Sequence, residues 1–120
     1  MEWLNVQADL RSRLESALGG VPVRVTVPAE RPVELVVVRR EGGRRINELL
    51  DRAGIGVTVW AGSEARAARL AHDVEIAMQR LTFADGYEVV EQEFSGSDPD
   101  PDTGSPRWYM SYTVTVHNLT

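Results

Sequence analysis

The chain has 120 residues, no cysteine and a net charge of −5, and all 13 of its basic residues are arginines. This length predicts a single domain over residues 1–120, and the absence of cysteine excludes a disulfide framework, a thiolate zinc site and a cysteine nucleophile. The acidic balance argues against a general affinity for nucleic acid, and no run of about 20 apolar residues predicts a membrane span, so we expect a cytosolic protein.

The chain begins with a predicted amphipathic helix. In residues 3–18 the apolar side chains recur at steps of three and four, which is the spacing of one buried helix face. Gly19 and Gly20 follow and are expected to end the helix. Residues 21–28 then alternate between apolar and polar and are bracketed by prolines, so they predict a short edge strand.

Two further strands are predicted before the second helix. Residues 33–40 contain four consecutive apolar residues, which favours a central strand covered on both faces. Residues 41–45 contain two glycines and are expected to form a loop. The state of residues 46–52 stays open, and residues 55–61 predict the next strand.

The second half predicts a helix and two more strands. Ser63 is expected to cap a helix over residues 64–81. Residues 87–94 predict a fourth strand, and strict alternation over residues 107–117 predicts a fifth that is buried on one face. The expected fold class is α+β, with a mixed, mostly antiparallel sheet of about five strands, two helices packed on it and the order α-β-β-β-α-β-β.

An acidic turn precedes the last strand. Residues 98–106 contain three prolines, which remove backbone donors and exclude a helix or a central strand. Asp98, Asp100 and Asp102 stand at alternate positions, as in the opening of a calcium loop. The twelfth position is Tyr109, however, where such a loop has a bidentate glutamate. We therefore expect a solvated turn whose carboxylates face water or the arginines of a neighbouring molecule.

No set of residues predicts catalysis. The two histidines, His72 and His117, have no serine, aspartate or second histidine at the spacing of a triad or a metal site. We expect no catalytic residue, no metal and no cofactor, and therefore no enzyme.

Arginines surround Gly42 and Gly43. A phosphate-binding loop would need a glycine-rich turn leading into a helix, and the sequence has neither that turn nor the lysine-containing pattern. A turn whose arginines contact another subunit is the interpretation we favour over phosphate binding.

Four segments taken in order resemble the tail terminator (tail completion) proteins of long-tailed bacteriophages, particularly those infecting actinobacteria. They are VPAERP at residues 27–32, VVVRREGG at 36–43, VWA at 59–61 before an alanine-rich helix, and DPDPDTGSPRW at 98–108. The resemblance covers about residues 20–120.

This resemblance implies a structural virion protein at the head–tail junction, assembled in the host cytoplasm. Such proteins form a homohexameric ring that caps the tail tube, ends tail polymerisation and offers a surface for the head connector. The implied partners are further copies of the chain, the tail tube protein and a head–tail connector or stopper protein. DNA passes through the ring without specific binding, and no membrane is involved.

From this resemblance we hypothesise a subunit or tail-tube interface in which arginines of one subunit meet aspartates of the next. Its expected residues are Arg39, Arg40, Gly42, Gly43, Arg44, Arg45, Asp98, Asp100, Asp102 and Arg107. The alternatives are a neck or head–tail connector protein of the same particle and a small non-enzymatic module that binds a ligand or peptide.

Overall fold

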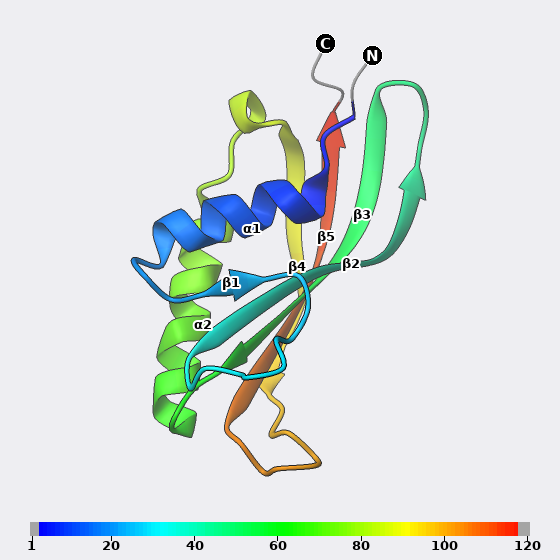
Figure 1. Cartoon of the computed structure of the whole chain (residues 1–120). Helices are drawn as coiled ribbons and strands as arrows, with labels where there is room; N and C mark the ends of the chain where they lie inside the picture. The colour runs from blue at the N-terminus through cyan, green and yellow to red at the C-terminus, as the bar shows by residue number, and fades with distance from the viewer. Residues whose placement is uncertain (1–2, 118–120) are drawn as a thin grey trace.

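The computed structural model describes residues 3–117 as a five-stranded sheet with two α-helices on one of its faces (Figure 1). The elements are α1 (Val6–Ala17), β1 (Val23–Arg24), β2 (Leu35–Arg45), β3 (Leu50–Trp60), α2 (Glu64–Gln79), the 3₁₀ helix η1 (Phe83–Asp85), β4 (Tyr87–Ser97) and β5 (Arg107–His117). This confirms the predicted α+β class. No helix in this part of the chain is long and apolar enough to cross a membrane.

The strands lie side by side in the order β1-β2-β3-β5-β4. β1 runs parallel to β2, and every other neighbouring pair is antiparallel, so the sheet is mixed and mostly antiparallel as expected. β1 pairs with β2 only through Val23 and Arg24. Beyond Val37, β2 is therefore the edge of the described sheet.

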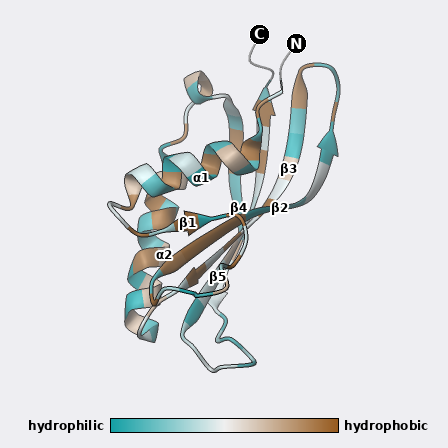
Figure 2. Ribbon diagram, in the orientation of Figure 1, coloured by the Kyte–Doolittle hydropathy of each residue, from teal (hydrophilic) through white to brown (hydrophobic). Residues whose placement is uncertain are grey.

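The main hydrophobic core lies between the helices and the sheet and includes residues of α1, α2, β2, β3 and β5. A second, smaller cluster of Leu35, Val37 and Trp60 lies on the opposite face. The start of β2 is thus covered on both faces, as the apolar run predicted. Figure 2 shows this change along β2, which is hydrophobic at its start and hydrophilic toward its end.

The loop expected at residues 41–45 is wrong, because these residues continue β2. A β-bulge between Arg40 and Gly42 shifts the pairing with β3 and keeps both glycines in the ladder. Gly43 has a φ of +96°, and a Cβ at this position would lie 2.1 Å from the carbonyl oxygen of Arg52. Two adjacent glycines indicate a turn from local chemistry alone, but here the partner strand supplies their hydrogen bonds.

The open segment 46–52 contains a turn, residues 46–49, and the start of β3. β3 therefore begins five residues before the predicted strand at 55, and β4 continues to Ser97, past the predicted end at 94.

The helix ends follow their caps. α1 begins at Val6, later than predicted, because the Asn5 side chain accepts a hydrogen bond from the Ala8 N–H at 3.1 Å. Ser63 caps α2 as predicted, with its hydroxyl accepting from the Arg66 N–H at 3.1 Å, and α2 ends at Gln79.

Candidate functional site

The hairpin of β2 and β3 extends past α1 as an arm, which we define as residues 39–52 (Figure 1). Every residue from 39 to 49 is exposed. The arm contains five of the 13 arginines and three of the 18 acidic residues, whereas the rest of the chain contains eight arginines and 15 acidic residues. The arm is therefore the basic region of an acidic protein.

An ion pair between a buried aspartate and a partly exposed arginine fixes the base of the arm. The Arg40 guanidinium donates to both carboxylate oxygens of Asp51, at 2.7 and 2.8 Å, and Asp51 is only 3% exposed. The hydrogen bonds from Arg40 hold the pKa of Asp51 below its usual value, although burial acts in the opposite direction. The Gln7 side chain accepts from the Arg40 backbone N–H at 2.8 Å. Arg40, expected at an interface, thus forms its ion pair inside the subunit.

Arg45 also has a partner inside the subunit. Its guanidinium carbon lies 4.5 Å from the centre of the Trp3 ring, a distance at which a cation is attracted to the face of the ring. Together with the Arg40–Asp51 pair, this contact braces the arm against the segment that leads into α1.

The outer face of the arm carries arginines without partners. Arg44 lies directly opposite Arg52 on the neighbouring strand, and Arg39 lies opposite Gly56. Among residues 3–117 no ion pair or hydrogen bond engages the guanidinium groups of these three arginines. Like charges placed directly opposite in a sheet destabilise it, so this face is suited to an external anion.

A cross-sheet hydrogen bond lies next to this face. The Tyr109 hydroxyl donates to the Glu41 carboxylate, which covers Gly56, and a Cβ on that glycine would lie 2.1 Å from a Glu41 oxygen. Burial and this bond raise the pKa of Tyr109 to about 12. Glu41 is thereby held over the sheet and directed away from the tip of the arm.

The tip of the arm is an ordered turn with two exposed aliphatic side chains. The Asn47 side chain accepts hydrogen bonds from the backbone N–H groups of Leu49 and Leu50, at 2.8 and 2.9 Å. Ile46 and Leu49 are 37% and 61% exposed. These residues were not among the candidates expected from the sequence, because the state of their segment was open. Their signal was two aliphatic residues flanking a polar pair.

The acidic turn, residues 98–106, uses most of its charges internally. Arg107 donates to the Asp98 carboxylate at 3.0 Å, and the Asp100 carboxylate accepts from the Asp102 N–H at 2.9 Å. Such backbone hydrogen bonds lower the pKa of Asp100. Asp102 is exposed and has no side-chain partner among the described residues.

The arm and the acidic turn lie at opposite ends of the sheet (Figure 1). Leu50, beside the tip, pairs with His117, whereas Trp60 at the other end of β3 pairs with Arg107, which follows the turn. Of the arginines and aspartates expected at an interface, Arg107 and Asp98 pair within one subunit, whereas the arginines of the arm do not reach the acidic turn.

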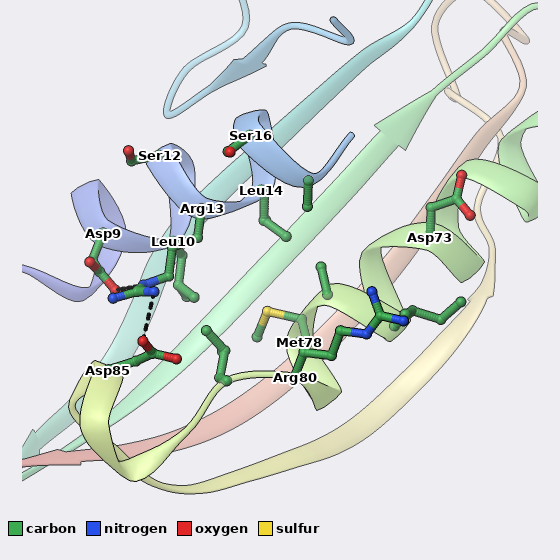
Figure 3. Close-up of a pocket in the computed structure, with 14 residues that line it drawn as sticks. Asp9, Leu10, Ser12, Arg13, Leu14, Ser16, Asp73, Met78, Arg80 and Asp85 are labelled. Atoms are coloured by element: carbon green, nitrogen blue, oxygen red, sulfur yellow. Dashed lines mark hydrogen bonds and ion pairs between the residues drawn. The ribbon is translucent and has the colours of Figure 1, made fainter. Parts of the chain in front are cut away.

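A groove of about 850 Å³ runs between α1 and α2 (Figure 3). Arg13 spans one end of it, with nitrogens 2.8 Å from Asp9 and 3.0 Å from Asp85. The Tyr87 hydroxyl also donates to Asp9 at 2.8 Å. The apolar part of the lining includes Leu10, Leu14, Ile76, Ala77, Met78 and Leu81. This groove is not predictable from the sequence, because it forms only where the two helices pack.

The described residues contain no cluster of three histidine, aspartate or glutamate side chains placed to hold a metal ion. Their arrangement is suited to docking through charged and apolar surfaces.

No protein-family model matches the chain, and no curated protein matches it. The fold is similar to that of a chain in a solved structure described as the virion of a native gene transfer agent (GTA) particle. The two chains share 16% sequence identity at a TM-score of 0.60, and the match covers 94% of this chain and 95% of the other. At this identity the likeness shows a shared fold.

Proposed function

We propose that this protein is a structural component of a phage-like virion, and that within the particle it is the tail terminator. The observation that carries this proposal is the match in fold, over nearly the whole of both chains, to a chain of a gene transfer agent virion. The ordered sequence segments that resemble tail terminator proteins support the finer assignment. In this role a ring of subunits caps the tail tube, ends its polymerisation and presents a surface to the head connector.

The distribution of charge supports a head-to-tail ring. A contact that joins two different surfaces of identical subunits closes into a ring when its rotation permits. Here a basic arm and an acidic turn lie at opposite ends of the sheet. We propose that the unpaired Arg39 and Arg44 of one subunit meet the acidic turn of the next, where Asp102 is the least engaged carboxylate.

Charge reversal tests this contact. In the double variant Arg39→Glu/Arg44→Glu, the monomer should stay folded, because both residues are exposed and their side chains have no partner within residues 3–117. Native mass spectrometry should show a shift from the hexameric ring to smaller species. The matched control is Arg11→Glu/Arg69→Glu, at two arginines on the helices. An unchanged ring in the arm variant would refute the contact.

The same proposal gives the acidic balance a role in the lumen. A ring of subunits with a charge of −5 each should repel DNA phosphates, so that the duplex slides without being held. Measurable duplex binding by the assembled ring at about 0.15 M salt would contradict this.

Gene disruption tests the position in the particle. Without a terminator, tails should lack heads and vary in length, as seen by electron microscopy of lysates, and wild-type protein supplied in trans should restore uniform tails. Headless tails of normal length would instead assign the protein to the neck or connector.

A further inference from the structure

We propose that the tip of the arm of one subunit docks into the groove between α1 and α2 of a second copy of this chain. The inference rests on the proposed ring and adds to it an apolar contact that is separate from the contact at the acidic turn.

The tip is preorganised for docking. The hydrogen bonds of Asn47 and the backbone bond from the Ile46 N–H to the Leu50 carbonyl, at 2.8 Å, define the turn. The ordered turn presents the Ile46 and Leu49 side chains to solvent. Since the turn is already formed, burial of these side chains requires little additional ordering.

The groove offers a matching environment. Its volume of about 850 Å³ lies within the range of about 300–1,000 Å³ typical of binding pockets, and Figure 3 shows Leu10, Leu14 and Met78 between polar residues along its edges. Leu10, Leu14 and Met78 are at most 1% exposed, so the apolar surface open to two docked aliphatic side chains comes from the partly exposed Ile76, Ala77 and Leu81.

The charges of the two surfaces are complementary. The arm has an excess of arginine, and the groove is lined by three aspartates and two arginines. Asp9 and Asp85 are paired with Arg13, so Asp73 is the aspartate of the groove that has no ion-pair partner among the described residues. The ends of α1 and α2 also border the groove. The last turn of α1 contains no basic residue, whereas Arg80 caps the end of α2. Helix C-termini carry partial negative charge and attract cations, so the end of α1 favours the approach of Arg52.

A second copy is the occupant that fits these observations. The arm cannot fold back onto the groove of its own subunit, because Arg40–Asp51 and Arg45–Trp3 hold it in line with the sheet, beyond α1 (Figure 1). A tip and a groove at different places on one subunit make a head-to-tail contact, which is the kind that a closed ring requires.

Disulfide trapping between subunits tests the docking, because the natural chain has no cysteine. A Leu49→Cys protein is mixed with an Ala17→Cys protein, whose new thiol lies on the rim of the groove. Under mild oxidation we expect most of the material to form covalent heterodimers. The control partner is Ala29→Cys, at an exposed position outside the groove, and should give at least tenfold less heterodimer.

A second variant measures the contribution of the tip. Leu49→Asp should weaken self-association by about tenfold or more, because it removes a side chain that becomes buried on docking. Val33→Asp, at a valine that is 66% exposed outside the arm and groove, should leave association unchanged. Circular dichroism should show both variants folded.

The outcomes separate the two proposals. The docking would be overturned, and the proposed function left standing, if the protein forms its ring, tolerates Leu49→Asp and gives no covalent heterodimer between the Leu49→Cys and Ala17→Cys proteins. A protein that stays monomeric at every concentration would overturn the docking, while uniform tails after gene disruption would overturn the terminator function.

Discussion

The arm and the acidic turn are both charged ends of β-hairpins in the same sheet, but they differ in how their charges are satisfied. In the turn, Arg107 neutralises Asp98, and backbone N–H groups occupy Asp100. In the arm, Arg40 and Asp51 pair with each other at the base. The Arg39 and Arg44 side chains have no internal partner among the described residues, and Ile46 and Leu49 at the tip are exposed. The comparison teaches that charge density by itself does not identify an interface. An interface is indicated where the subunit leaves charged side chains unpaired and apolar side chains exposed.

The largest expected effect is at the base of the arm. Arg40→Leu leaves the Asp51 carboxylate buried without its cation, so the free energy of unfolding should fall by about 3 kcal/mol in urea titrations. The control Arg39→Leu, on the outer face, should change it by less than about 0.5 kcal/mol. Equal effects of the two substitutions would contradict the distinction between the paired arginine at the base and the unpaired arginine on the outer face.

The same pair predicts a pH dependence. Because the pKa of Asp51 is lower in the folded than in the unfolded chain, its pairing stabilises the protein above the unfolded value of about 3.9. This contribution is lost as the pH falls through the folded value. The difference in unfolding free energy between wild type and Asp51→Asn should therefore be greatest near neutral pH and shrink below about pH 4. A difference independent of pH would contradict the assignment.

Glycine substitutions sharpen the comparison of the two regions. Gly43→Ala in the arm meets both a positive φ and the Arg52 carbonyl at 2.1 Å, so we expect a loss of about 2–3 kcal/mol. Gly104→Ala in the acidic turn has a φ of +71° but open space around it, so we expect about 1 kcal/mol. Both losses are measurable by chemical denaturation. If Gly104→Ala costs as much as Gly43→Ala, the positive φ alone accounts for the loss at Gly43, and the contact with the Arg52 carbonyl contributes nothing.

The smallest expected effect has the opposite sign. Arg44→Thr removes the repulsion from Arg52 and places a β-branched residue in a strand, so the dilute monomer should gain about 0.5 kcal/mol of stability. The same substitution should weaken self-association in sedimentation experiments. A loss of monomer stability would mean that Arg44 has a partner within the subunit.

Much of the fold was predictable because it follows from local pattern. The alternation over residues 107–117 matched β5, and the Ser63 cap correctly started α2. The arm was not predicted, since its two glycines indicate a loop unless a partner strand is known. The sequence did not show which of the candidate arginines are paired inside the subunit and which are free for an interface. Nothing local distinguishes Arg40, which binds Asp51, from Arg39 beside it, which faces the other side of the sheet.

The sequence by itself determined the alternation of strands, the helix caps, the acidic balance and the cluster of arginines, because each depends on residues close together in the chain. Only the tertiary structure decided which charges are paired, that two aliphatic residues form an exposed tip, and that a groove opens between the helices. The physical reason is that burial and pairing depend on contacts between distant segments. Asp51 is buried by the packing of the arm base, and Asp9 and Asp85, far apart in the chain, share Arg13.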